Sequence, residues 1–475
     1  MIDLIKGKNI LVVGMARSGM AAVALLSRIG AAKITIADQK QPQELTAELA
    51  GLDRYSSLEV KTGGTPPDLV TPDLSVIVKS PGVPPDLDLF KRAGSLDIPV
   101  LSEVELAYAF IKAPMIGVTG TNGKTTTTAL ITAMLKEARF DPVVSAGNIG
   151  NPLCGVVDSI NSQGFIVAEL SSFQLENINC LRPLVAVFLN FAEDHLDYHG
   201  TLERYFAAKA RIFENQLAGD YVVLNAGDRK VSSLAKNCMG QILWFDRAPV
   251  RAGVGLKEDY ITLFNPGCKP CEICPAAEMA LPGEHNLENA LAASAAAWAA
   301  GADPQAIGNV LRSFKAIEHR LEYVATLAGV DFINDSKGTN PGASIKALKS
   351  FPGRKKILIA GGKDRGSNFE ELANMIRYEV SYLFLFGESK DKLALSVEKT
   401  GFSNYRQVEG LEEAVRGARS KARAGDIILL SPACASWDMF TDYEARGNLF
   451  KKIVIGLKAE EELKQRVEGA NSNDR

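Results

Sequence analysis

The sequence predicts an α/β protein with several domains, and three observations support this prediction. Short β-branched apolar runs alternate with helical stretches along the 475 residues. The runs are continuously apolar, which is expected where helices cover both faces of a parallel sheet. Gly and Pro punctuate the connections between them. The length suggests about three domains at roughly 150 residues each.

Strand and helix signals follow one another as repeated strand–helix units. Ten buried strands are predicted, at Asn9–Val13, Lys33–Ala37, Ser75–Lys79, Pro114–Val118, Phe165–Leu170, Leu184–Leu189, Tyr221–Leu224, Lys356–Ala360, Tyr382–Phe386 and Asp426–Leu430. Helices are predicted between them, for example over Lys124–Ala138 and Asn289–Ala300. We place domain boundaries where new strand series begin, which gives predicted domains at 1–112, 113–317 and 318–475.

Composition excludes several classes of protein. The chain is 46% apolar and 23% charged, which excludes full-length disorder. Its net charge of -3 shows no basic excess for coating nucleic acid or an anionic membrane. No apolar run reaches the ~18 residues of a membrane span, and the N-terminus lacks the pattern of a signal peptide. Seven cysteines are few and odd in number, so we expect a reducing cytoplasm and no disulfide framework.

A glycine-rich loop, Gly117-Val-Thr-Gly-Thr-Asn-Gly-Lys-Thr-Thr126, carries the sharpest chemical signal. It follows a predicted strand and opens a predicted helix, which is the context that a phosphate-binding P-loop requires. Backbone N–H groups would face phosphate oxygens, Lys124 would reach the terminal phosphates, and the Thr125 hydroxyl can hold Mg²⁺. The usual first Gly is replaced by Val118, so Gly120 and Gly123 would act as the hinges. The alternative is an ordinary glycine-rich turn.

Acidic and histidine side chains follow the next two predicted strands. Glu169 ends one strand, where a carboxylate beside a P-loop commonly grips Mg²⁺. The segment Asn190-Phe-Ala-Glu-Asp-His-Leu-Asp-Tyr-His-Gly200 carries two of the four histidines. It indicates either a second cation or phosphate contact, or an acidic capping turn with a packed histidine. Lys209 follows on a predicted helix. From the residues alone, it is interpreted as a lysine on an amphipathic helix face, with its apolar stem packed and its charge in solvent.

The motifs, in their order along the chain, resemble the Mur ligase family. They are Thr119-Gly-Thr-Asn-Gly-Lys-Thr, Glu169-Leu-Ser-Ser-Phe-Gln, Asp194-His-Leu-Asp, Ala207-Ala-Lys-Ala-Arg-Ile-Phe-Glu-Asn, Gly283-Glu-His-Asn-Leu-Glu-Asn-Ala and Glu318-His-Arg. The resemblance implies a Rossmann-like N-terminal domain that binds a UDP-sugar, a central P-loop ATPase with a parallel-rich sheet, and a Rossmann-like C-terminal domain that binds an amino acid. It also implies a ligase that phosphorylates a carboxylate with ATP and then lets an amine attack it.

Three further segments resemble one branch of the family. They are Leu101-Ser-Glu-Val-Glu-Leu, Ile333-Asn-Asp-Ser-Lys-Gly-Thr-Asn340, and Leu430-Ser-Pro-Ala-Cys-Ala-Ser-Trp-Asp-Met-Phe440 with the following Glu444-Ala-Arg-Gly-Asn. That branch adds D-glutamate to UDP-N-acetylmuramoyl-L-alanine in peptidoglycan precursor synthesis. An Asp-Asn-Pro-Arg motif, associated with diaminopimelate recognition, does not occur in the sequence. The resemblance therefore implies these two small molecules as substrates, and we expect a monomer.

The resemblance also assigns roles to residues of the nucleotide site. It implies catalytic roles for Lys124, His195, Lys209 and Arg320. Thr125 and Glu169 would hold one Mg²⁺, and His195 with a carbamylated Lys209 a second. ATP would be bound by Gly120, Thr121, Asn122, Gly123, Lys124, Thr125, Thr126, Asn286, Asn289, His319, Arg320 and Asp335. Without the family, helix capping would explain Asn286 and Asn289.

The carbamate on Lys209 also has a chemical argument. A bare ammonium beside two Mg²⁺ ions would be repelled, whereas a carbamate offers two anionic oxygens to a hard cation. The flanking side chains Tyr205, Phe206, Ile212 and Phe213 favour desolvation, which lowers the pKa of a lysine.

The substrate residues implied by the family lie at the two ends of the chain. The UDP-sugar would be bound by Arg17, Ser18, Gly19, Asp38, Ser80 and Asn148. The family often has Asp-Thr-Arg where this chain has Asp38-Gln39-Lys40. The two carboxylates of D-glutamate would be held by Lys337, Thr339, Arg365 and Ser436.

Three alternatives stay open at the level of sequence. Another Mur-type or folylpolyglutamate-type ligase would share the P-loop. A nicotinamide-dependent dehydrogenase could use the Gly14–Gly19 turn, although Ala16 replaces its second glycine. The Cys268-Lys-Pro-Cys-Glu-Ile-Cys274 segment predicts a surface hairpin with free thiols, the alternative being a Zn²⁺ site that lacks a fourth ligand.

Overall fold

The computed structural model describes residues 1–148, 150–281, 283–314, 318–351 and 353–473. The chain divides into two compact units. The first contains residues 1–280 and 286–314, and the second contains residues 281–285 and 315–475. The predicted boundary between residues 317 and 318 abuts residues 315–317, which lie outside the described part of the chain.

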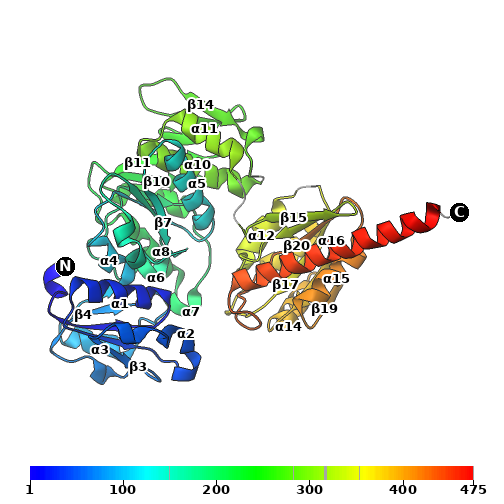
Figure 1. Cartoon of the computed structure of the whole chain (residues 1–475). Helices are drawn as coiled ribbons and strands as arrows, with labels where there is room; N and C mark the ends of the chain where they lie inside the picture. Colours follow the sequence, from blue (N-terminus) through cyan, green and yellow to red (C-terminus); the bar gives the residue numbers. More distant parts are fainter. Residues whose placement is uncertain (149, 282, 315–317, 352, 474–475) are drawn as a thin grey trace. The chain divides into compact units, whose positions relative to one another are not determined.

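The first unit opens with a five-stranded parallel sheet in the order β3-β2-β1-β4-β5 (Figure 1). Its strands are β1 (Asn9–Val13), β2 (Lys33–Ala37), β3 (Leu58–Lys61), β4 (Leu74–Lys79) and β5 (Val100–Ser102). The helices of this region include α1 (Arg17–Ile29), α3 (Asp88–Ser95) and α4 (Glu103–Tyr108). Ile10, Val12 and Val76 are buried in its core because the central strands are covered on both faces.

A nine-stranded sheet forms the rest of the first unit, in the order β14-β13-β12-β11-β10-β9-β6-β8-β7. Its strands are β6 (Met115–Thr119), β7 (Val143–Gly147), β8 (Phe165–Glu169), β9 (Val185–Phe188), β10 (Tyr221–Asn225), β11 (Gln241–Asp246), β12 (Gly253–Lys257), β13 (Tyr260–Phe264) and β14 (Cys271–Pro275). Pairing is parallel from β7 to β12 and antiparallel at β12–β13 and β13–β14. Its helices include α5 (Lys124–Glu137), α6 (Ser172–Leu175), α7 (Leu196–His199), α8 (Leu202–Ala210), α10 (Glu284–Ala299) and α11 (Pro304–Ser313).

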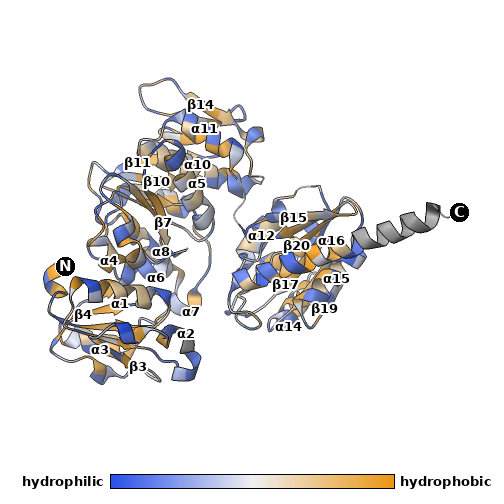
Figure 2. Cartoon of the chain, viewed as in Figure 1, coloured by the Kyte–Doolittle hydropathy of each residue, from blue (hydrophilic) through white to orange (hydrophobic). Residues whose placement is uncertain are grey.

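The second unit contains a six-stranded sheet in the order β15-β16-β20-β17-β18-β19. The strands are β15 (Glu322–Leu327), β16 (Val330–Asn334), β17 (Lys356–Gly361), β18 (Val380–Phe386), β19 (Tyr405–Gln407) and β20 (Ile427–Leu430), and only β15–β16 pair antiparallel. The helices are α12 (Pro341–Lys349), α13 (Glu370–Glu379), α14 (Lys390–Glu398), α15 (Leu411–Lys421) and α16 (Tyr443–Asn473). Figure 2 shows apolar residues concentrated in the strands.

The α/β class and all ten predicted strands are confirmed, with shifts of at most two residues at their ends. In parallel sheets the carboxyl ends of neighbouring strands meet at one edge, so the predicted site residues after β6, β8 and β9 are brought together. Within the described part of the chain, the model contains no helix with the length and apolar character to cross a bilayer.

Candidate active site

The P-loop lies between β6 and α5, as the sequence predicts. Gly120 has a φ of 147° and Gly123 a φ of 85°, which are conformations that favour glycine and fit the hinge role. The loop is also tied to the next strand, because Asn190 Oδ1 accepts the N–H of Asn122 at 2.9 Å. A Cβ on Gly123 would lie 2.1 Å from Asn289 Oδ1, so α10 packs directly against the loop.

Two lysines meet at one carbonyl of this loop. Lys124 Nζ donates to the Gly120 carbonyl at 3.0 Å, and Lys209 Nζ donates to the same oxygen at 2.8 Å. Lys209 is 2% exposed, and burial, followed by the charge of Lys124, holds its pKa well below the usual value, against the opposing effect of Asp194 and Glu169. Such an amine is biased toward its neutral, nucleophilic form.

Carboxylate and hydroxyl oxygens lie beside these lysines. Glu169 is buried at the end of β8 and pairs in register with Val118 of β6. Its Oε1 accepts Asn148 Nδ2 at 2.9 Å, so Asn148 contacts a predicted metal ligand. Thr125 is buried on the first turn of α5, and the neighbouring Thr126 Oγ1 makes no hydrogen bond within the described part of the chain. These groups supply the hard oxygen ligands that Mg²⁺ prefers.

His195 begins the four-residue helix α7 with a φ of 53°. Its Nε2 lies 3.6 Å from Asp194 Oδ2, and its ring meets Phe173 edge-to-face at 4.8 Å between centroids. Tyr205 links His195 to Lys209: its ring centroid lies 6.0 Å from the imidazole and 4.8 Å from Lys209 Nζ. The structure therefore brings His195 and Lys209 to one aromatic cluster.

A separate pocket of about 290 Å³ lies at the carboxyl edge of the first sheet, lined by residues that include Gly14, Asp38 and Ser80. The carboxylate of Asp38 links the loops after β1 and β2, because its two oxygens accept the backbone N–H groups of Met15 and Lys40 at 2.7 and 2.9 Å. Arg17, Ser18 and Gly19 open α1, and a Cβ on Gly19 would lie 1.9 Å from the Gly14 carbonyl oxygen. Gln39 and Lys40, the two side chains that differ from the family pattern, also line the pocket, together with Thr65.

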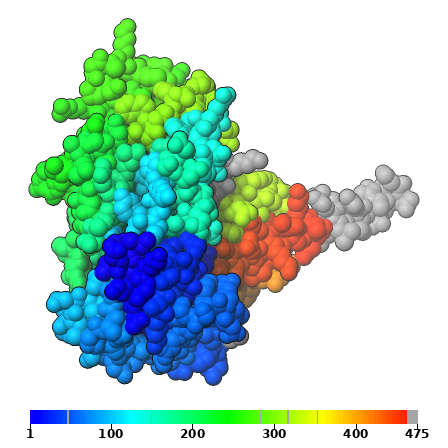
Figure 3. All heavy atoms as spheres, turned by 60° about the vertical axis from the view of Figure 1, so that its left-hand side comes forward, coloured from blue at the N-terminus to red at the C-terminus, as the bar shows by residue number. Residues whose placement is uncertain are grey.

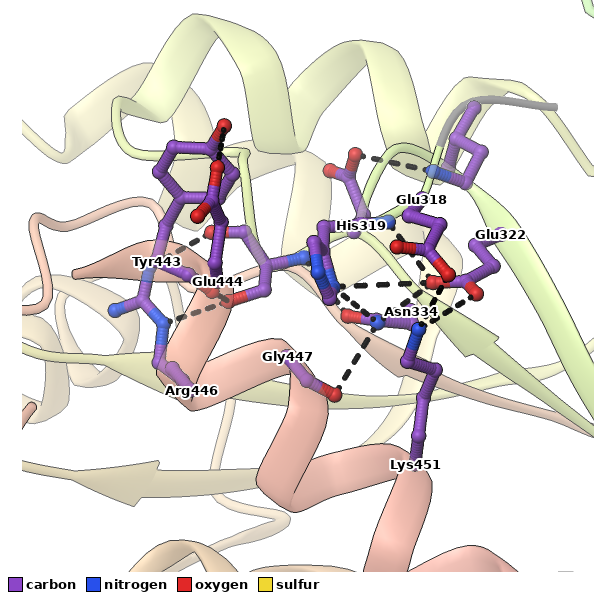
Figure 4. Close-up of polar contacts among 12 residues, drawn as sticks. Glu318, His319, Glu322, Asn334, Tyr443, Glu444, Arg446, Gly447 and Lys451 are labelled. Atoms are coloured by element: carbon purple, nitrogen blue, oxygen red, sulfur yellow. Dashed lines mark hydrogen bonds and ion pairs between the residues drawn. The ribbon is translucent and has the colours of Figure 1, made fainter. Parts of the chain in front are cut away.

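In the second unit, His319 is held by a buried hydrogen-bond network (Figure 4). Asn334 Nδ2 donates to His319 Nδ1 and to Glu322 Oε2, each at 3.0 Å, and Lys451 Nζ lies 3.2 Å from Glu322 Oε1. Burial lowers the pKa of His319, which favours the neutral ring with its proton on Nε2.

Arg320 and Asp335 lie close to this network. Arg320 Nε is buried and makes no hydrogen bond within the described residues. Asp335 accepts Ser431 Oγ at 2.7 Å. Burial raises the pKa of Asp335 to about 6, and the charge of Arg320 opposes that rise.

The predicted amino-acid residues also gather in the second unit. Arg365 Nη2 donates to the Thr339 carbonyl at 3.4 Å, and its guanidinium lies over the Trp437 ring at 5.4 Å. Trp437 adjoins the buried Ser436. Lys337 lies over the ring of Tyr443 at 5.0 Å.

Arg446 was missed as a site residue by the sequence analysis. It is fully buried on α16 and donates to Ser336 O at 2.8 Å and to Cys434 O at 3.2 Å (Figure 4). Arg446 thereby joins the loop after β16 to the loop after β20, which carry three of the predicted glutamate residues. The signal available in the sequence was the segment Glu444-Ala-Arg-Gly-Asn, which contains Arg446 and resembles one branch of the family.

The cysteine-rich segment forms the β13–β14 hairpin. Cys268 and Cys271 are exposed, whereas Cys274 is buried. Among the described residues, no three His, Cys, Asp or Glu side chains gather as a metal-binding group, so the structure offers no support for the zinc alternative.

Comparisons with known proteins agree with this geometry. Residues 118–297 match the family model described as the Mur ligase middle domain, and residues 319–434 match the Mur ligase, glutamate ligase domain. A UDP-N-acetylmuramoylalanine–D-glutamate ligase from Pelotomaculum thermopropionicum is 45% identical over 452 residues, covering 95% of this chain and 98% of the relative.

The chain belongs to the Mur ligase family. A second relative of the same name, from Clostridioides difficile, is 41% identical over 456 residues, covering 96% of this chain and 100% of its own length. The UDP-N-acetylmuramate–alanine ligase of Thermotoga maritima shares the fold, with a TM-score of 0.57 at 21% identity over 95% of this chain and 100% of its own. A MurF ligase from Thermotoga maritima, solved in complex with ADP, has a TM-score of 0.57 at 15% identity, over 96% of this chain and 97% of its own.

Proposed function

We propose that this Mur ligase joins D-glutamate to UDP-N-acetylmuramoyl-L-alanine at the expense of ATP, as a step of peptidoglycan precursor synthesis in the cytoplasm. The observation that carries the proposal is the meeting of Lys124 and Lys209 at the Gly120 carbonyl, beside the buried Glu169. The names of the relatives, which match over 95% of the chain, support the choice of substrates.

The chemistry follows from the reacting groups. A carboxylate is a poor acyl donor, because hydroxide is a poor leaving group. Transfer of the γ-phosphoryl group of ATP to the carboxylate of the L-alanyl residue gives an acyl phosphate and ADP. The amine of D-glutamate then attacks the acyl carbon, expels phosphate and loses a proton. In the first step Lys124 would neutralise charge on the β/γ-phosphates, and the P-loop N–H groups would orient them.

Residues of the first unit fit bound Mg²⁺. The buried Thr125 and Glu169 would hold one ion, and His195 with Lys209 would hold a second. Bound Mg²⁺ would supply neutralisation of the phosphate charge.

A carbamate on Lys209 would remove the charge repulsion between Lys209 and Lys124. Two ammonium groups at one carbonyl repel each other, and burial disfavours the charge on Lys209. The neutral amine would attack CO₂, forming an N–C bond and releasing one proton. The product is anionic, so it would attract both Lys124 and a metal ion.

We assign nucleotide roles in the second unit to His319, Arg320 and Asp335, and D-glutamate recognition to Lys337, Thr339, Arg365 and Ser436. The buried, unbonded Nε of Arg320 supports an anionic ligand at that position. We further propose that residues 1–112, 113–317 and 318–475 act as UDP-sugar, ATP and amino-acid domains of a monomer.

The test is phosphate release from ATP with UDP-N-acetylmuramoyl-L-alanine across a panel of amino acids. D-Glutamate should support release, and L-alanine, diaminopimelate and a D-alanyl-D-alanine dipeptide should not. Release that is equally fast with another amino acid would refute the assignment. Thermal shift separates the dehydrogenase alternative, because ATP with Mg²⁺ should raise the melting temperature and NAD should not.

A further inference from the structure

A buried ion pair joins the two sheets of the first unit. Lys79 ends β4 and is 3% exposed, and its Nζ lies 3.2 Å from Glu176 Oε2, just after α6. The same Nζ donates to Tyr198 Oη at 2.5 Å. Figure 3 shows the blue and light-blue residues of the first sheet packed against cyan and green segments of the same unit.

Tyr198 is fixed by three partners at once. Its hydroxyl donates to Glu176 Oε2 at 2.8 Å, accepts from Lys79, and lies 3.3 Å from the Val83 carbonyl oxygen. Its ring packs edge-to-face on Phe173 at 4.5 Å. A phenol held in this way stops α7 from rotating about its axis.

The helix that Tyr198 anchors needs outside support. Helix α7 has only four residues, which is too short to be stable by itself. No side-chain hydrogen bond caps its start, and the residue that precedes its first turn, His195, is in the left-handed conformation. A non-glycine residue in that conformation is strained and persists only when its surroundings enforce it. Tyr198, three residues later, is one such enforcing contact, and the hydrogen bond of His199 to Ser172 is another.

Lys79, the basic residue of the ion pair, lies next to the pocket of the first sheet. Ser80 and Val83 line the pocket, and they close a turn in which Val83 N–H donates to the Ser80 carbonyl at 3.1 Å. Lys79 precedes this turn directly, and Tyr198 contacts its last carbonyl. No residue of 194–199 lines the pocket among the residues that the structure describes. A ligand bound in this pocket that orders the turn can therefore affect α7 only indirectly, through contacts between protein residues.

We propose that Lys79, Glu176 and Tyr198 are positioning residues that couple occupancy of the nucleotide-sugar pocket to the placement of His195. The inference rests on the proposed role of the pocket. When a uridine diphosphate orders the Ser80–Val83 turn, the Val83 carbonyl and the Lys79 ammonium fix the Tyr198 hydroxyl. Helix α7 then holds His195 in its left-handed conformation, and the His195–Lys209 side of the site is formed before ATP reacts.

The four histidines of the chain make a direct test possible. Enzyme labelled with ¹³C at histidine Cε1 gives at most four signals, and His195→Gln identifies the signal of His195. The probe is UDP alone, because it lacks the muramoyl group that would approach His195 directly. The samples contain neither ATP nor Mg²⁺, so catalysis does not enter the readout.

UDP should shift the His195 signal in the wild-type enzyme. In Tyr198→Phe, UDP should bind within about threefold of the wild-type affinity while the His195 shift falls to less than about half. Lys79→Met should behave in the same way. Lys356→Met is the matched control, since Lys356 is an equally buried lysine paired with Glu379 at 2.6 Å in the second unit, and it should keep the full shift.

Two results would overturn the inference alone: UDP binding to the wild type without a His195 shift, and a full shift retained in Tyr198→Phe. If UDP fails to bind the wild-type enzyme, the pocket assignment and the inference both fall. Glutamate-dependent phosphate release, measured on the same enzyme preparation after ATP, Mg²⁺ and UDP-N-acetylmuramoyl-L-alanine are added, then shows whether the proposed reaction survives.

Discussion

Replacement of Lys209 by methionine should abolish activity and yet stabilise the folded enzyme. Lys209 and Lys124 donate to the same carbonyl at 2.8 and 3.0 Å, so their nitrogens lie at most about 5.8 Å apart. At an effective dielectric constant of about 20, two positive charges at that separation would repel by about 3 kcal/mol, and this is an upper limit because burial already biases Lys209 toward its neutral form. Methionine fills a similar volume without charge, and Lys124 continues to satisfy the Gly120 carbonyl.

The substitution also removes a favourable contact, because Lys209 lies over the Tyr205 ring at 4.8 Å. Such a cation–π contact contributes about 1 kcal/mol. The net expectation is a gain of up to about 2 kcal/mol in the free energy of unfolding. Urea unfolding in CO₂-free buffer measures it, and glutamate-dependent phosphate release measures activity.

Two controls separate charge from packing. Lys209→Arg keeps the positive charge but cannot form this carbamate, so it should be inactive without being stabilised. Lys356→Met should be destabilising, because it leaves Glu379 without its buried partner. A ¹³CO₂-labelled wild-type enzyme should show one carbamate signal that both Lys209 variants lack. An active Lys209→Met or Lys209→Arg enzyme, or a loss of stability above about 1 kcal/mol in Lys209→Met, would leave Lys209 with only a packing role.

Three other predictions can be checked with the same enzyme. Lys124→Ala should lower the rate of phosphate release by about 10²-fold or more, because the β/γ-phosphates lose a neutralising charge; near-normal turnover would contradict the phosphate assignment. D-Glutamine should be a poor substrate beside D-glutamate, since Lys337 and Arg365 would face an uncharged amide; equal kcat/KM values for the two would remove the carboxylate argument. Glu103→Gln should change the pH dependence of stability. Glu103 is fully buried, accepts the Cys154 N–H at 2.6 Å, and burial raises its pKa to about 7 from an ordinary 4.5. Because the folded-state pKa is the higher one, the wild-type enzyme loses stability as the pH rises from about 4.5 to about 7. The Tm of Glu103→Gln relative to wild type should therefore increase between about pH 5 and about pH 8, and a constant difference would show that Glu103 does not titrate in this range.

Local chemistry made much of the fold and site predictable. Continuous apolar runs marked the central strands because both of their faces are buried, and the P-loop was visible because its glycines, lysine and threonine lie within ten residues. Edge strands were missed where one face meets solvent. Tyr405–Gln407 and Leu58–Lys61 carry polar side chains, and Glu322–Leu327 alternates between buried and exposed positions, so none shows a continuous apolar run.

Contacts between distant segments could not be predicted. The hydrogen bond between Asn148 and Glu169 depends on the pairing of β7 with β8, and the link from Lys79 to Tyr198 joins residues that lie 119 positions apart. Neither spacing produces a periodic signal in the sequence. The roles of such residues depend on which strands lie side by side, and a short sequence motif does not specify the order of the strands.

Positive φ values occur at two proposed site residues, the metal ligand His195 and the adenine contact His319, and also at non-glycine residues outside the site, such as Asp97 and Glu258. His195 and His319 have φ values of 53° and 64°, in a region that few non-glycine residues adopt. At His319 the enforcing neighbour is Gly447 on α16, where a Cβ would lie only 2.2 Å from His319 Nδ1. A glycine inside a helix costs roughly 0.5–1 kcal/mol relative to alanine. The fold therefore retains a strained histidine together with an unfavourable helix residue, and stability alone would select neither.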